Sequence, residues 1–368
     1  MGSLQLDLWQ KKQAALLYFF ASDEYLKGLQ TRVKDVRNLA DGLLNLSRAE
    51  GRDQFIRNSR WGERDTSENW SNHGWSFLAD FELSVSRHLA DRASNIYHKT
   101  GAYQCGRGMS EFSMDWTTPN EQEKFDSMFA STTHYAAYID ETMDRTHCAG
   151  QWDDFSFALA WEEHANLFSR IPKFRVREDI TSKTGEIPPK TGVYISSDFP
   201  NASMQFAWNG DKYGKLLECS IFNGLGQRAL DTVGRSKLWL DDNAMLAFVE
   251  RNANAPELIN DPFYSPSPKP HLAASLVARN AFTSITTKWY YVELLSGGFD
   301  SIEEAEDVEV AVGFKELRKD AGSLCEQSGF YFTPAAFGSR RHFELGDIFP
   351  AIDSNYGHTI WQWDEKQS

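Results

Sequence analysis

The segment that decides the fold is ECSIFNGLGQRALDTVG, residues 218–234. A run of β-forming residues, 216–222, leads into Gly224, Gly226 and Ala229, and this spacing matches the glycine-rich turn of a dinucleotide-binding fold. In that fold the turn follows the first strand of a βαβ unit and has parallel strands beside it. The strands around the segment therefore decide between a nucleotide site and a structural turn.

The residues upstream predict hairpins rather than parallel strands. Three short runs rich in β-branched and aromatic residues precede the segment: KFRVREDI, TGVYISSD and SMQFAW, at residues 173–180, 191–198 and 203–208. Turn-forming residues separate these runs, which is typical of an antiparallel meander. No second βαβ unit of regular length follows the segment. We therefore predict that Gly224 belongs to a tight structural turn from strand to helix, with a nucleotide site as the alternative.

The carboxylates downstream of the turn have an ordinary explanation as well. Asp241 and Asp242 stand at about the distance of a ribose-binding acid, but they also directly precede apolar Met245, Leu246 and Val249. Aspartate ahead of such a pattern is a preferred helix N-cap. The sequence predicts a helix here that Asp241 or Asp242 caps.

Helical periodicity dominates the first half of the chain. Apolar residues repeat at steps of three and four over residues 26–43, and a second such pattern covers residues 78–96. A third helix has a defined start, because Thr118 can cap it, Pro119 suits its first position and Glu121 completes a capping box. These patterns predict a helical bundle.

The whole pattern predicts the α+β fold class: an N-terminal helical bundle followed by a mixed, mainly antiparallel β region with inserted helices. A fourth helix is expected within residues 152–168, and the polar stretch 51–74 is expected to be a loop. We expect two domains, a mainly helical one at 1–171 and an α+β domain with an antiparallel meander at 172–368.

Composition restricts the partners. The 368 residues include 52 acidic and 38 basic ones, for a formal net charge of −14. This charge repels phosphate backbones and anionic membranes, so no nucleic acid and no membrane partner is expected. No stretch approaches a membrane span, and the N-terminal run AALLYFFAS is interpreted as part of an amphipathic helix rather than a signal peptide. Four widely spaced cysteines suggest free thiols in a reducing compartment, and we expect a cytoplasmic protein.

One face of the third helix carries residues that could bind a metal. His134, Glu141, Asp144 and His147 lie at helical spacing there. A two-metal bundle needs a matching acid-x-x-His pair on a second helix, and the expected fourth helix contains no such pair. GxSxG, HExxH and Walker motifs are also missing from the sequence. We therefore predict no cofactor, no metal and no enzyme, and a metal- or nucleotide-dependent enzyme that uses this face or the Gly224 turn is the alternative.

The C-terminal half resembles a known pair of families. The residues that carry the resemblance are the strand at 206–208, the join VGRSKLW at 233–239 and the block at 328–350. Over residues 191–363 this pattern is similar to the immunity-protein families numbered 71 and 72 of bacterial polymorphic toxin systems. The helical half fits only in its general character.

This resemblance implies an inhibitor that binds a cognate secreted toxin and protects the producing cell. Toxins of this class are commonly delivered by contact-dependent or type VI-like secretion. An acidic, aromatic-rich chain suits a basic toxin surface through steering charge and buried aromatic anchors. The candidate contacts are acidic clusters, several of them beside aromatic residues, although such clusters also occur on solvated helix faces and at helix caps. They are Trp152, Asp153, Asp154, Glu162, Glu163, Glu303, Glu304, Glu306 and Asp307.

Overall fold

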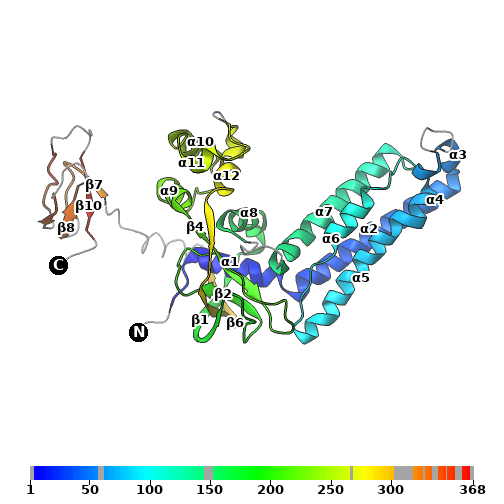
Figure 1. Cartoon of the computed structure of the whole chain (residues 1–368), viewed down its shortest axis with the longest axis horizontal. Coiled ribbons are helices and arrows are strands. Elements are labelled where there is room, and N and C mark those ends of the chain that lie inside the picture. Colours follow the sequence, from blue (N-terminus) through cyan, green and yellow to red (C-terminus); the bar gives the residue numbers. More distant parts are fainter. Residues whose placement is uncertain are drawn as a thin grey trace. The chain divides into compact units, whose positions relative to one another are not determined.

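The computed structural model describes residues 4–56, 62–144, 152–265, 268–301, 318–325, 328–333, 339–344, 346–352 and 359–364. The chain forms two compact units, Met1–Asp300 and Ser301–Ser368. Helices dominate its first part and antiparallel sheets follow, so the predicted α+β class is confirmed (Figure 1). Among the helices of the described residues, none combines the length and the apolarity that crossing a bilayer requires.

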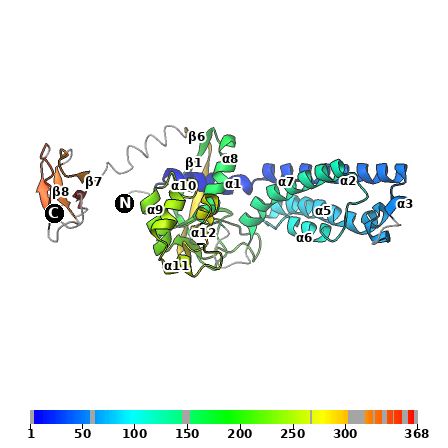
Figure 2. The ribbon, with the colours of Figure 1, turned by 90° about the horizontal axis from the view of Figure 1, so that it is seen from above.

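Three long helices form the bundle of the first unit. Helices α2 (Asp23–Glu50), α5 (Trp75–Asp91) and α7 (Pro119–Met143) lie side by side, and the shorter α6 (Ala102–Met109) lies against α5 and α7 (Figures 1 and 2). Their facing sides are apolar and buried, as the periodicity predicts. The buried residues include Leu29, Val33, Val36 and Ala40 of α2, Leu78, Phe81 and Val85 of α5, and Phe125, Ala136 and Ile139 of α7.

The start of α7 matches the prediction in detail. Thr118 and Glu121 form the capping box, with Pro119 at the first helical position. Glu121 also pairs with Arg52, just beyond the end of α2, at 2.6 Å between Nη1 and Oε2. One side chain thus caps α7 and joins it to the end of α2.

The stretch expected to be a loop at residues 51–74 contains short helical turns instead. They are α3 (Asp53–Ile56), a 3-10 turn (Gly62–Asp65), α4 (Ser67–Asn69) and a π turn (Trp70–Gly74). Asp53 explains part of this order, because its carboxylate accepts hydrogen bonds from the backbone N–H and the hydroxyl of Ser67.

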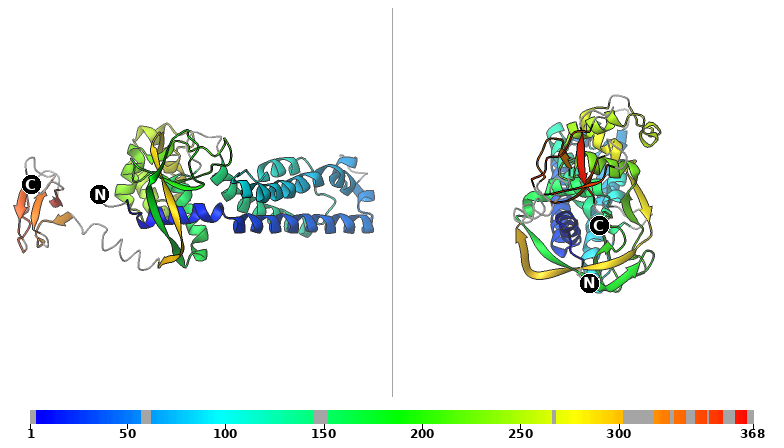
Figure 3. Two further views of the ribbon diagram at one scale, coloured as in Figure 1. Left: turned by 90° about the horizontal axis from the view of Figure 1, so that it is seen from below. Right: turned by 90° about the vertical axis from the view of Figure 1, so that its left-hand side faces the viewer.

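Helix α1 (Leu8–Phe20) is the predicted N-terminal helix, but it is buried rather than amphipathic at a surface. Asp7 and Gln10 form its capping box, and Ala14, Leu16, Leu17 and Phe20 are all fully buried. It packs against the strand β1 (Arg170–Lys183) and against α8 (Asp154–His164), as Figure 3 shows from below. A helix that is apolar on most sides belongs in a core.

The main sheet has an order that differs from the predicted meander. Its strands are β1, β6 (Lys288–Ser301), β2 (Gly192–Ser196) and β3 (Gln205–Ala207), in that spatial order. The β2–β3 hairpin is antiparallel as expected, but β6 lies between β1 and β2, so the meander is wrong. The pairing of Tyr194 with Tyr291 buries aromatic side chains that lie almost 100 residues apart in the chain.

The quoted segment forms a structural turn, as predicted. Strand β4 (Cys219–Phe222) pairs antiparallel with β5 (Phe282–Ile285), and helix α9 (Gly224–Val233) follows β4 directly. Asn223 Oδ1 accepts hydrogen bonds from the N–H groups of Leu225 and Gly226. A Cβ on Gly226 would stand 2.3 Å from the carbonyl oxygen of Ala281, so this glycine permits close packing of α9 on the chain before β5. Because the strands are antiparallel and Asn223 occupies the helix N-terminus, the geometry is not that of a dinucleotide turn.

Three further helices pack on α9. They are α10 (Asp242–Arg251), α11 (Pro256–Ile259) and α12 (Pro270–Ala278). Asp241 caps α10 by accepting from the N–H of Ala244, which confirms one of the two predicted caps. Leu225, Met245, Phe248, Leu258 and Val277 share one apolar core with Trp239.

The structure does not divide at residue 171, where the sequence suggested a domain boundary. The helical half and the β region share contacts: Tyr18 donates to the carbonyl of Val292, and Tyr97 packs on Phe206 and Trp208. Both halves are therefore parts of the first unit.

The second unit is built on a sheet of its own. Strands β7 (Arg318–Asp320), β10 (Ile360–Trp363), β8 (Gly329–Phe332) and β9 (Arg341–Phe343) form an antiparallel sheet in that order. Its core consists of Cys325, Tyr331, Phe343, Phe349 and Trp361.

Candidate functional site

Asp154 was a candidate partner contact, but it is an interior residue with 2% of its surface exposed. Its carboxylate accepts the indole N–H of Trp9 at 2.8 Å and that of Trp239 at 2.7 Å. Arg235 Nη1 lies 2.6 Å from both carboxylate oxygens. Asp154 therefore joins α1, α8 and the segment between α9 and α10, and it is not available to a partner.

The two residues before Asp154 are also structural. Trp152 is buried, stacks on Phe20 with ring centroids 5.7 Å apart, and donates its indole N–H to Thr142. Asp153 is the N-cap of α8 and accepts from the backbone N–H of Ser156 at 2.7 Å, while burial raises the pKa of its carboxyl group. The prediction of Trp152 and Asp154 as surface contacts is thus wrong, because both side chains serve the core.

Glu162 and Glu163 are exposed on α8, as a partner-binding site requires. Glu163 Oε1 lies 2.9 Å from Nε2 of His134 on α7, and the same carboxylate accepts the hydroxyl proton of Tyr138. The predicted contacts Glu303, Glu304, Glu306 and Asp307 lie outside the described residues.

The face considered for a metal is held by hydrogen bonds and ion pairs. His134 contacts Glu163, and Asp144 pairs with Lys99 at 2.8 Å. His147 lies outside the described residues. Within the described ranges, no three His, Cys, Asp or Glu side chains converge as metal ligands would.

Glu141 and Glu163 lie beside the same tyrosine. Burial, the hydrogen bond to Glu163 and the charges of Glu163 and Glu141 together raise the pKa of the Tyr138 hydroxyl. We call Glu141 of α7 and Glu162 and Glu163 of α8 the acidic face. All three are exposed. Desolvation by the surrounding protein raises the pKa of Glu141 to about 7, so a cation placed beside Glu141 would favour its charged form. The acidic face therefore offers carboxylates to a basic partner. Sequence reasoning found two of its members and assigned Glu141 to a different role.

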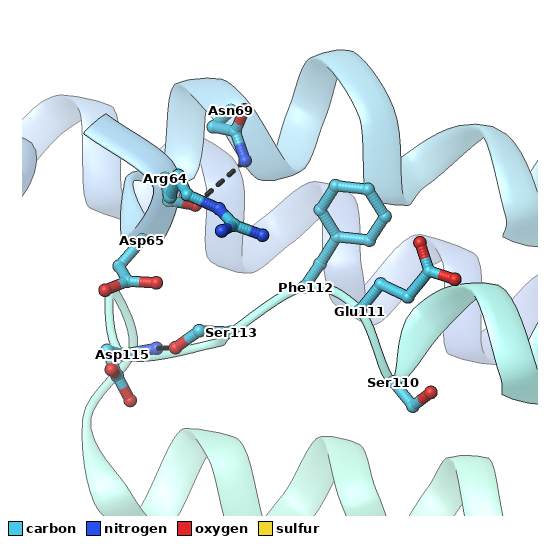
Figure 4. A pocket seen from close by; sticks show the side chains of 8 residues that line it. All are labelled: Arg64, Asp65, Asn69, Ser110, Glu111, Phe112, Ser113 and Asp115. Carbon is cyan, nitrogen blue, oxygen red and sulfur yellow. Dashed lines mark hydrogen bonds between the residues drawn. The ribbon is translucent and has the colours of Figure 1, made fainter. Parts of the chain in front are cut away.

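The best-formed hollows in the described part of the structure are shallow and open, and none of them is an enclosed cavity. One of about 440 Å³ lies between the turns near α4 and the loop after α6, and Arg64 extends into it (Figure 4). Its polar groups are partly bonded within their own turns, with Asn69 donating to the carbonyl of Arg64 and Ser113 accepting from the N–H of Asp115. This hollow shows no nucleophile paired with a base.

The hollow beside the acidic face is different in chemistry. It is a groove of about 570 Å³ between α6 and α7, which we call the α6–α7 groove. Small and aromatic side chains line most of it, and Glu141 of the acidic face stands at its edge. An apolar groove next to exposed charge is typical of a protein-binding surface.

Comparisons of the chain with protein families, with curated proteins and with solved structures find no match. The geometry of the acidic face and the α6–α7 groove is therefore the main guide to function.

Proposed function

We propose that this chain is an immunity protein that binds a cognate secreted antibacterial toxin in the cytoplasm of the producing cell and neutralises it by direct contact. The observation that carries the proposal is the acidic face beside the α6–α7 groove, because it combines exposed carboxylates with apolar contact area. The resemblance to immunity-protein families 71 and 72 names the class of partner.

Charge supports a basic partner. Helix α7 has three exposed carboxylates, Glu123, Asp126 and Glu141, and one lysine, while α8 has two, Glu162 and Glu163, and no lysine or arginine. Together with the net charge of −14, this field accelerates encounter with a cationic protein surface and repels anionic ones. A toxin that acts on nucleic acid or another anionic substrate has such a cationic surface, and covering it blocks the substrate.

Apolar contact supplies the affinity that exposed charge cannot. Exposed ion pairs contribute about 0–1 kcal/mol each, whereas aromatic anchors in a desolvated centre can contribute several times more. Tyr103 of α6, which lines the α6–α7 groove, is 74% exposed and is suited to such an anchor.

Co-purification with the product of the adjacent gene tests the proposal, with growth of cells that express this product measured with and without the chain. We expect the product to stop growth alone, to form a stable complex with the chain, and to be harmless when the chain is present. A harmless product that does not bind the chain would refute the proposal.

A further inference from the structure

The α6–α7 groove has an apolar middle. Tyr103 of α6 and Phe129 and Ala137 of α7 line it, and Gly106 leaves space between them, since a Cβ placed on Gly106 would meet no atom within 4 Å. An open position of this kind on a helix admits a side chain from another molecule.

The two ends of the groove carry opposite charges. Thr100, just before α6, donates its backbone N–H and its hydroxyl to Asp140 near the end of α7, so the start of α6 lies by the end of α7. Glu141 therefore stands at this end, and Arg107 stands about 6 Å farther along α6 than Tyr103, one helical turn away. Within the described residues, neither Glu141 nor Arg107 forms a side-chain ion pair.

The charge around the groove selects its occupant. The pattern of anion, apolar middle and cation would suit a second copy of the chain in a two-fold arrangement. A second copy, however, would bring its own α7, with three exposed carboxylates and one lysine, against the acidic face. That contact is repulsive, whereas a basic protein makes an attractive contact there.

We propose, resting on the proposed function, that the α6–α7 groove receives a segment of the toxin with an apolar side chain between Tyr103 and Phe129, a lysine or arginine at Glu141 and an acidic residue at Arg107. The groove is then the central contact, and Glu162 and Glu163 form its charged rim. The toxin's cationic residue near Glu141 fixes the direction in which the segment lies.

Gly106→Phe tests this proposal with little risk to folding. The new ring fills the groove, its Cβ meets no neighbour, and replacing glycine in a helix favours the helix. Gly42→Phe is the matched control, because Gly42 is an exposed glycine of α2 whose Cβ would also meet no atom within 4 Å. Thermal unfolding of both variants confirms that each is folded.

Titration of the purified product of the adjacent gene with each variant gives the result. We expect binding of Gly106→Phe to weaken by about 10-fold or more, while Gly42→Phe binds like the unchanged chain. Equal binding of all three forms would overturn the assignment of the groove as the toxin-binding site and leave the proposed function standing. No binding by the unchanged chain would overturn both. A dimer of the free chain that Gly106→Phe dissociates would show that a second copy is the occupant, and this too would overturn the proposal.

Discussion

The indole N–H of Trp239 donates a 2.7 Å hydrogen bond to Oδ1 of Asp154, across 85 residues of chain. Trp239 has a φ of 74°, a left-handed backbone conformation that a residue with a large side chain rarely adopts. Its buried ring and its bond to Asp154 hold it there. The join VGRSKLW, which contributes to the family resemblance, thus has a structural role, since its Arg235 and Trp239 both bind Asp154.

Removing the Asp154 carboxylate should destabilise the fold strongly. Asp154→Ala leaves two indole N–H groups without their acceptor and the one-third exposed guanidinium of Arg235 without its partner, and each unsatisfied buried donor costs about 1–3 kcal/mol. Urea unfolding measures the loss. Glu162→Ala, on the exposed side of the same helix, is the control and should change stability by no more than about 0.5 kcal/mol. Equal effects of the two variants would show that Asp154 is not the link described.

The turn between β4 and α9 should distinguish its two glycines. Gly226→Ala brings a Cβ to 2.3 Å from the carbonyl oxygen of Ala281 and should cost about 1–3 kcal/mol. Gly224→Ala meets only the flexible end of Arg228 at 3.6 Å and should be tolerated. Urea unfolding of the pair tests this, and a tolerated Gly226→Ala would contradict the packing role of the turn.

Buried His88 should make the fold sensitive to acid. Burial, with Arg92 and His98 adding to it, lowers the pKa of His88 to about 3. Between pH 6.5 and 3 the unfolded chain therefore binds a proton that the folded chain does not, so stability falls as pH falls, by up to about 1.4 kcal/mol per pH unit.

Unfolding of the unchanged chain and of His88→Gln at several pH values from 7 to 4 measures this effect. The glutamine can still accept the hydrogen bond that the N–H of His98 gives to His88, but it does not titrate. As pH falls, the free energy of unfolding should decrease more for the unchanged chain than for the variant. A difference that stays constant with pH would contradict a neutral, buried His88.

Reversing charge on the acidic face should slow association with the toxin. Glu162→Lys combined with Glu163→Lys should lower the association rate about 10-fold at low salt, with a smaller effect at high salt, because steering is screened by ions. Stopped-flow or surface-based binding kinetics measures it. Asp35→Lys combined with Glu250→Lys, a double reversal at exposed positions of α2 and α10, is the control for the same change in net charge. The same slowing by this control would remove the special role of the acidic face.

The sequence was informative where neighbouring residues determine the structure. The start of α7 follows from Thr118, Pro119 and Glu121, which lie within four residues of one another. The turn at Gly224 could be assigned because short strands with hairpin signals precede it, even though the glycine spacing alone suggested a nucleotide site.

Distant pairing limited what could be predicted. Strand β6 enters the sheet between β1 and β2 from far along the chain, and no local pattern encodes that position. Asp154 looked like a surface acid because its three partners come from two distant segments. Helix α6 was missed for another reason: Gly106 and Gly108 weaken its helical pattern, yet a Cβ on Gly108 would stand 2.4 Å from the Phe77 ring, so close packing requires that glycine.

The most direct test of the central claim is the growth of cells that express the product of the adjacent gene, with this chain either present or absent. We expect growth to stop without the chain and to recover with it, and the Gly106→Phe variant to restore growth less well than Gly42→Phe. Continued arrest in the presence of the folded, unchanged chain would contradict the claim that it neutralises a toxin.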